Sequence, residues 1–204
     1  FQRMGWSAAV SVVLFVVGYS LHRRFTFEMA RDFGIAVYAH EAEDVAGVYA
    51  RVGRNCDHVH VDLIDETMLP TAWPVRLDVL DEVRRLWPNV PVSLHVMSRY
   101  PRQWVDQTWD RVDWFLLHVE AQDDLWELIF ACREREKRVG IVWRDGMSIA
   151  SLMPYLPHVD FVMVLGIRQP GGSGQTMSPR AIEVAATLDR LRTRYGFDVM
   201  FDGG

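Results

Sequence analysis

The sequence has few cysteines and no surplus of positive charge. Among 204 residues only Cys56 and Cys132 are cysteines, far apart and without metal-type spacing. This excludes a disulfide framework and fits a reducing compartment. Lys and Arg number 22 against 27 Asp and Glu, a formal net charge of −5. The electrostatic footprint of a nucleic-acid-binding protein is therefore absent, and we expect no nucleic-acid partner.

Charged residues are also missing from residues 5–21, which are followed at once by His22-Arg23-Arg24. This apolar run approaches the ~20 residues that span a bilayer, and charge after the run argues against a signal peptide. We predict a transmembrane helix within residues 1–27 and a second domain at 32–204. Because basic flanks stay inside, that domain is expected to be cytoplasmic and tethered to the inner face of the membrane. A buried core helix is the alternative.

The two ends of the chain do not resemble natural termini. The sequence opens on Phe1 and stops on Asp202-Gly203-Gly204. We therefore expect it to be a piece of a longer protein.

Beyond residue 27, short β-rich runs alternate with stretches of helical spacing. The runs are nearly continuous in apolar residues, as in parallel strands covered by helices. They lie at 34–39, 58–64, 90–97, 114–120, 139–143, 161–167 and 198–202. Apolar positions between them predict helices over 77–86, 125–132 and 181–191. The alternation predicts an α/β domain with a parallel sheet.

An open doubly wound sheet and a closed eight-stranded barrel both fit this alternation. No Gly-x-Gly-x-x-Gly turn follows the first strand, which removes the main support for the open sheet. We therefore predict a (β/α)8 TIM barrel whose eighth strand is missing from this piece.

Imidazoles and carboxylates gather at the ends of four predicted strands, where the active site of such a barrel forms. They are His58, His60, Asp62, His95, His118, Glu120 and Asp202. With a period of two, the first three share one face of their strand. Burying so many ionisable groups without a ligand is costly, whereas histidines with carboxylates suit Zn²⁺, Fe²⁺ or Mn²⁺. The pattern predicts one divalent metal ion, although any single histidine here can instead be a hydrogen-bonded core residue.

The segment His60-Val61-Asp62-Leu63-Ile64-Asp65, with Pro70 after it, resembles the His-Val-Asp-x-Met-Asp-Gly signature of ribulose-phosphate 3-epimerases. Residues 94–97, 118–121, 170–175 and 202–204 are similar to later motifs of that family in the same order. The similarity covers residues 34–204. It implies a TIM barrel of the ribulose-phosphate-binding type, isomerase chemistry and a sugar-phosphate substrate.

By position, the resemblance makes His60, Asp62, His95 and Asp202 the ligands of the metal ion. It also makes Asp62 and Asp202 the proton-transfer pair. One carboxylate removes the proton next to a carbonyl, and the other returns a proton to the opposite face of a metal-stabilised enediolate. The resemblance further implies substrate contacts by a second set of residues, namely Met97, Gly171, Gly174, Gly203 and Gly204.

The loops that face the substrate depart from the family pattern. Tyr38 replaces a serine of the first strand, and Arg144 and Arg168 stand in altered fifth and sixth strand endings. Two guanidinium groups at the mouth suit a more anionic ligand, but both residues can equally be solvated. A kept metal site in a changed pocket favours a different phosphorylated ketose or related sugar phosphate. The sequence leaves the oligomeric state open, a homo-oligomer included.

Two alternatives accompany the epimerase hypothesis. The first is a decarboxylase or aldolase-type barrel of the same broad superfamily. Related decarboxylases carry Asp-x-Lys-x-x-Asp on the equivalent strand, but this chain has Asp62-Leu63-Ile64-Asp65 and no lysine there, which counts against this alternative. The other alternative is a non-catalytic sugar-phosphate-binding barrel that regulates a membrane sugar-handling module. Residues 5–27 weakly resemble the last membrane helix of GtrA-like proteins, which are linked to the movement of lipid-carried sugars.

Overall fold

The computed structural model describes residues 12–15, 32–171 and 175–203. Seven strands form six parallel pairs, each between strands that follow one another along the chain. They are β2 (Phe33–Tyr38), β3 (His58–Ile64), β4 (Val92–Met97), β5 (Trp114–His118), β6 (Arg138–Arg144), β7 (Phe161–Leu165) and β8 (Asp198–Asp202). All seven predicted strands form, and the predicted parallel α/β architecture of a TIM barrel is confirmed for this part of the ring.

An eighth strand, β1 (Val12–Phe15), closes the ring by pairing antiparallel with both β2 and β8. The predicted transmembrane helix is therefore wrong for these four residues. A run rich in β-branched residues fits a strand as well as a helix. Here it satisfies the backbone groups that β2 and β8 would otherwise leave unpaired at their edges.

The rest of the predicted membrane segment lies outside the described residues, as does the predicted domain boundary between residues 27 and 32. Within the ranges that the structure describes, no helix combines the length and hydropathy needed to cross a bilayer. The membrane-tethered, cytoplasmic location stays a prediction.

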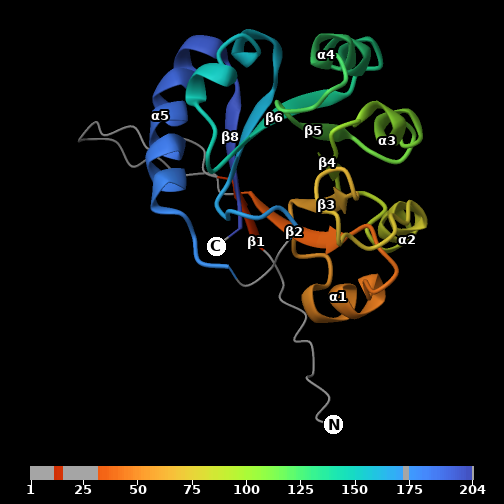
Figure 1. Ribbon diagram of the computed structural model, residues 1–204. Coiled ribbons are helices and arrows are strands. Elements are labelled where there is room, and N and C mark those ends of the chain that lie inside the picture. The colour runs from red at the N-terminus through yellow and green to blue at the C-terminus, as the bar shows by residue number, and fades with distance from the viewer. Residues whose placement is uncertain (1–11, 16–31, 172–174, 204) are drawn as a thin grey trace.

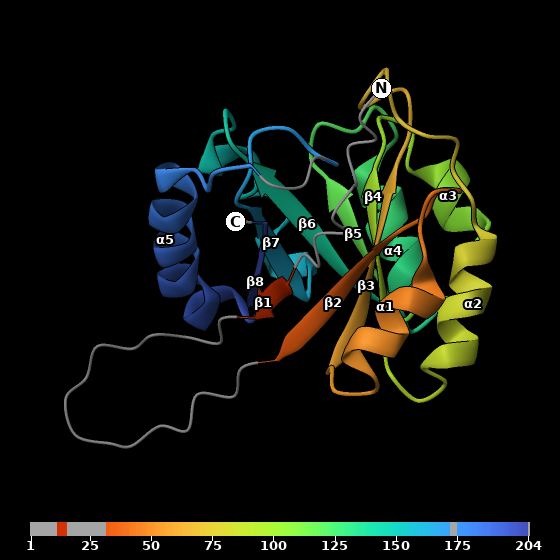
Figure 2. The same cartoon turned by 90° about the horizontal axis from the view of Figure 1, so that it is seen from below.

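Helices lie outside the strands (Figure 1). They are α1 (Val45–Val52), α2 (Asp78–Leu86), α3 (Arg102–Asp106), α4 (Leu125–Glu134) and α5 (Pro179–Tyr195), with 3-10 turns η1 (Ile149–Ser151) and η2 (Leu156–His158) before β7. Figure 2 shows α5 on one flank of the strands and α1, α2 and α3 on the other. The three predicted helices correspond to α2, α4 and α5.

The start of α4 illustrates how the sequence specifies a helix. The carboxylate of Asp124 accepts hydrogen bonds from the backbone N–H groups of Trp126 and Glu127. Leu125, Leu128, Ile129 and Cys132 are buried, so one face of the helix packs on the sheet. The helices α1 and α3 were not predicted because they are short, and α1 contains three β-branched valines and a glycine.

The strands bury both of their faces. On β3, Val59, Val61 and Leu63 join the apolar layer between strands and helices, while every residue of the strand is buried. A second apolar cluster, which includes Trp114 and Phe161, fills the inside of the barrel. Because side chains alternate along a strand, His58, His60 and Asp62 share the interior with that second cluster, as predicted.

Gly34 makes room for the ring of His58. A Cβ atom at Gly34 would lie 2.2 Å from His58 Cε1 and Nε2, and the ring is held in place by Trp114, whose centroid is 5.4 Å away. We expect Gly34→Ala to lower the free energy of unfolding by about 1–3 kcal/mol, measured by urea denaturation. In a His58→Ala background the same change should cost much less. Equal costs in both backgrounds would contradict this packing explanation.

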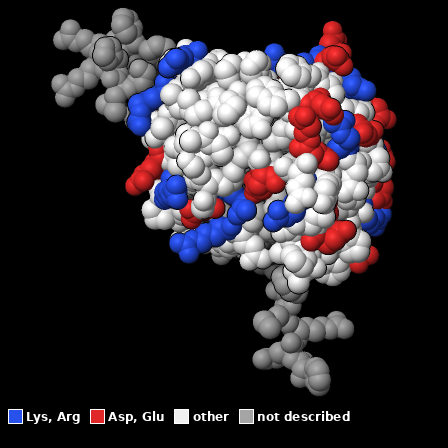
Figure 3. All heavy atoms as spheres, turned by 45° about the horizontal axis from the view of Figure 1, so that its top comes forward, with Lys and Arg blue, Asp and Glu red and all other residues white. Residues whose placement is uncertain are grey.

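Charged side chains of both signs intermingle on the face shown in Figure 3, and a broad area of that face carries neither sign. Several exposed charged side chains of the protein are paired, such as Arg102 Nη2 with Glu127 Oε2 at 2.6 Å. Exposed pairs of this kind contribute roughly 0–1 kcal/mol each. The ionisable groups relevant to function are therefore those buried in the interior.

Candidate metal centre

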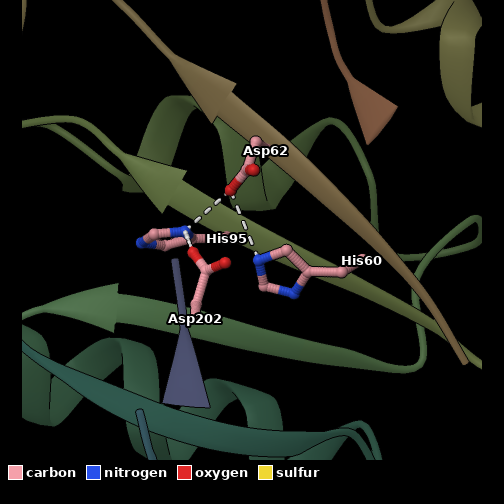
Figure 4. Close-up of side chains that lie close together, drawn as sticks. All are labelled: His60, Asp62, His95 and Asp202. Atoms are coloured by element: carbon pink, nitrogen blue, oxygen red, sulfur yellow. Dashed lines mark hydrogen bonds and ion pairs between the residues drawn. The ribbon is translucent and has the colours of Figure 1, made fainter. Parts of the chain in front are cut away.

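Four ionisable side chains from three strands meet inside the barrel, close to the carboxyl ends of the strands (Figure 4). His60 and Asp62 come from β3, His95 from β4 and Asp202 from the end of β8. Asp62 and His95 are direct partners in the register of β3 and β4. Asp202 joins them because the strands curve into a ring. None of the four is more than 6% exposed.

The distances are those of a compact cluster. One ligand atom from each of the four residues lies within 4.8 Å of all the others. Asp62 Oδ1 is 2.9 Å from His95 Nδ1 and 3.3 Å from His60 Nε2. Asp202 Oδ2 lies 4.0 Å from His95 Nδ1. The predicted convergence of these four side chains is confirmed, and their donor set of nitrogens and carboxylate oxygens can hold a divalent ion.

His60 offers a nitrogen that faces Asp62 but makes no hydrogen bond among the described residues. Its Nδ1 lies 2.9 Å from Ser93 Oγ, whose hydroxyl donates to the carbonyl of Val59 at 3.4 Å. Ser93 then accepts the Nδ1 proton, and His60 Nε2 keeps its lone pair. That Nε2 atom is buried and has no hydrogen-bond partner among the described residues. Buried polar atoms rarely stay unpaired, so this orphaned nitrogen fits a metal ligand.

His95 is contacted from its other side by His118 of β5. The two Nε2 atoms are 2.9 Å apart. His118 Nδ1 lies 3.4 Å from Glu120 Oε1, and the same oxygen accepts a hydrogen bond from Arg144 Nε. From the sequence, His118 and Glu120 were expected at this end of the barrel but had no assigned role, and Ser93 was not identified. The available signal was that Ser93 shares a face of β4 with His95, two residues later.

The two carboxylates have pKa values that are shifted in opposite directions. Burial acts to raise the pKa of Asp62, but the imidazoles of His60 and His95 outweigh it and hold that pKa below its ordinary range. The pKa of Asp202 is raised to about 7, first by burial and then by the negative charge of Asp62. Burial lowers the pKa of His95 to about 4 in spite of Asp62. Carboxyl groups whose pKa values are pushed apart are typical of acid–base sites.

The two arginines considered for anion binding each face a carboxylate of the protein. Arg144 is paired with Glu120. Arg168 Nε lies 3.5 Å from Asp145 Oδ2, and its side chain is 84% exposed. Of the two, Arg168 is therefore a solvated loop residue and Arg144 is engaged by the protein.

The residues predicted to contact substrate lie around the same end of the barrel where they are described. Met97 is buried at the end of β4. Gly203 follows Asp202 with a φ of 82°, and Gly171 has a φ of 74°, conformations that favour glycine. Gly174 and Gly204 lie outside the described residues. Contact with a substrate stays a prediction for all five.

Asp65, the last carboxylate of the motif, is buried but serves the loop after β3. Its Oδ1 accepts hydrogen bonds from the Thr67 N–H at 3.0 Å and the Thr67 hydroxyl at 2.5 Å. Its Oδ2 accepts from Trp104 Nε1 of α3 at 2.7 Å. Asp65 thus ties the loop to α3 and is not part of the cluster of four.

Ribulose-phosphate 3-epimerases are similar to this chain over most of its length. The profile of the Ribulose-phosphate 3 epimerase family matches residues 33–204. A ribulose-phosphate 3-epimerase of Treponema pallidum (strain Nichols) is 31% identical over 183 residues, which cover 86% of this chain and 82% of the relative. One of Schizosaccharomyces pombe is 28% identical over 173 residues, covering 80% and 73%. The chloroplastic ribulose-5-phosphate-3-epimerase of Arabidopsis thaliana is 26% identical over 156 residues, covering 73% and 54%.

Proposed function

Because the chain belongs to the ribulose-phosphate 3-epimerase family, we propose that it inverts a carbon centre of a phosphorylated ketose or related sugar phosphate. The observation that carries this proposal is the cluster of His60, Asp62, His95 and Asp202, buried together with their ligand atoms within 4.8 Å of one another. Grouping ionisable side chains inside an apolar barrel is costly unless a charged ligand compensates for it.

These four residues would hold one divalent ion, Zn²⁺, Fe²⁺ or Mn²⁺. A donor set of two imidazoles and two carboxylates suits these ions. The low pKa of His95 keeps that ring neutral near pH 7, as a ligand must be. When bound, the ion supplies Lewis acidity, which stabilises negative charge on the substrate oxygens next to the reacting carbon.

Asp62 and Asp202 would transfer the proton. They reach the centre from β3 and β8, which are not neighbours in the ring, so they can face a planar intermediate from two directions. In the ion-free site the two carboxyl groups already differ in proton affinity, because the pKa of Asp62 is lowered and that of Asp202 is raised to about 7. Removal of a proton from one face and return to the other inverts the carbon without redox chemistry.

The proposal is tested by solvent deuterium incorporation. Protein loaded with Zn²⁺ or Mn²⁺ is incubated in D₂O with D-ribulose 5-phosphate, and NMR follows the C3 proton and the epimeric product. We expect the C3 proton to exchange and the epimer to appear. Because the strand endings at Tyr38 and Arg144 are altered, other phosphorylated ketoses are assayed in parallel. A sugar phosphate that raises the melting temperature, with no exchange in any member of the panel, would favour the non-catalytic binding barrel.

Binding of the ion should depend on pH through Asp202. Below pH 7 this carboxyl carries a proton in the folded protein, because its pKa is raised to about 7. The ion must displace that proton, so the apparent affinity should fall at least tenfold per pH unit below 7. His60 adds to the slope, because Asp62 and Asp202 outweigh burial and raise its pKa. Calorimetric titration with Zn²⁺ between pH 5.5 and 8.5 measures this slope. The Asp202→Asn variant should bind more weakly and lose the part of the slope that Asp202 contributes; an unchanged slope would contradict the assignment.

A further inference from the structure

The far nitrogen of His95 faces another imidazole. The rings of His95 and His118 are nearly parallel, at 7°, with centroids 5.1 Å apart. Their Nε2 atoms are only 2.9 Å apart. Because the nitrogens approach far more closely than the ring centres, the rings meet edge to edge and share one hydrogen bond. Both side chains are fully buried, so the hydrogen bond is shielded from water.

The position of the proton on His95 then determines the tautomer of His118. A His95 that offers the Nδ1 lone pair to an ion must carry its proton on Nε2. That proton is donated to His118 Nε2, which must be bare. His118 therefore carries its proton on Nδ1, which lies 3.4 Å from the carboxylate oxygen of Glu120.

The far end of this row is anchored by Arg144. Its Nε donates to the same Glu120 Oε1 that faces His118. Glu120 follows the last residue of β5 by two positions and Arg144 ends β6, so the anchor comes from the ends of two neighbouring strands. Arg144, which departs from the family pattern at the end of β6, is thus paired with Glu120.

We propose that His118 and Glu120 are positioning residues, which hold His95 in the tautomer that presents Nδ1 to the divalent ion, and that Arg144 orients Glu120. This inference rests on the proposed function, since it requires an ion at the centre. His60 is oriented in the same manner by Ser93, a neutral partner. Groups that orient a ligand histidine typically contribute 10–100-fold to metal affinity.

The first test needs no variant. In the Zn²⁺-loaded protein labelled with ¹⁵N-histidine, two-bond ¹H–¹⁵N spectra report which nitrogen of each ring is protonated. We expect His95 to be protonated on Nε2 and His118 on Nδ1. A His118 protonated on Nε2 would overturn the inference.

The second test measures Zn²⁺ affinity by competition with a chelator. Glu120→Leu removes the carboxylate that faces His118 Nδ1 and should weaken binding 10–100-fold, whereas Glu120→Gln keeps an oxygen at that position and should recover most of the loss. Glu127→Leu is the matched control, because Glu127 also pairs with an arginine, Arg102, but contacts no ligand histidine. It should bind Zn²⁺ as the unaltered protein does.

The outcomes separate this inference from the proposed function. If the unaltered protein binds no divalent ion, the proposed function fails and this inference with it. If it binds Zn²⁺ and Glu120→Leu binds equally well, only the positioning role is overturned. Should Glu120→Leu fail to fold, the tautomers of the unaltered protein still decide.

Discussion

Replacing Asp202 by asparagine is expected to reduce epimerisation by at least ~10³-fold, because the amide has nearly the same shape but cannot exchange a proton with the substrate. The side chain is only 5% exposed, so solvent cannot readily replace it. Turnover is measured by NMR with Zn²⁺ or Mn²⁺ in excess, since the same change weakens one ligand. Metal content is determined on each sample.

The pattern of residual exchange makes this prediction sharper. If Asp62 and Asp202 serve opposite faces, any deuterium incorporation that survives in Asp202→Asn should be confined to one of the two epimers. Asp62→Asn should confine it to the other epimer. The matched control is Asp198→Asn, which changes a carboxylate at the other end of β8 and should leave turnover intact. Full turnover in Asp202→Asn would refute the proton-transfer role.

Replacing Asp65 by alanine is expected to lower the free energy of unfolding by ~3 kcal/mol. The change leaves the Thr67 hydroxyl and N–H and the Trp104 indole N–H without their acceptor. Asp65 is itself 1% exposed, so water does not easily take its place. Urea denaturation of the ion-free protein, followed by circular dichroism, measures the loss.

Two further variants separate this structural role from chemistry. Asp106→Ala changes an exposed carboxylate on the same short helix as Trp104 and should alter stability by less than ~0.5 kcal/mol. Asp65→Asn keeps one oxygen for Thr67 but turns an amide group toward the Trp104 N–H, so an intermediate loss is expected. Zn²⁺ affinity of folded Asp65→Ala should stay near that of the unaltered protein. A large loss of affinity with normal stability would show that Asp65 belongs to the metal centre.

The local sequence pattern predicted the strands well, because a strand buried on both faces is rich in apolar residues along its whole length. The run at 58–64 alternates valine and leucine with histidine and aspartate, and β3 forms over that range. The same local pattern was misleading at Val12–Phe15. A short apolar run is compatible with strand and helix alike. What decides is the presence of two strand edges, one about 20 residues and the other about 185 residues away along the chain.

The sequence by itself determined the parallel alternation of strands and helices, because that depends on residue types at short spacing. Its motifs also indicated the family, and the resemblance to that family implied the four candidate ligands. Only the tertiary structure decided that Ser93 orients His60, that His118 and Glu120 stand behind His95, and that Arg144 is paired with Glu120. These contacts join different strands, and their geometry follows from the register and curvature of the closed ring. No local spacing encodes which side chains that curvature brings within hydrogen-bond distance.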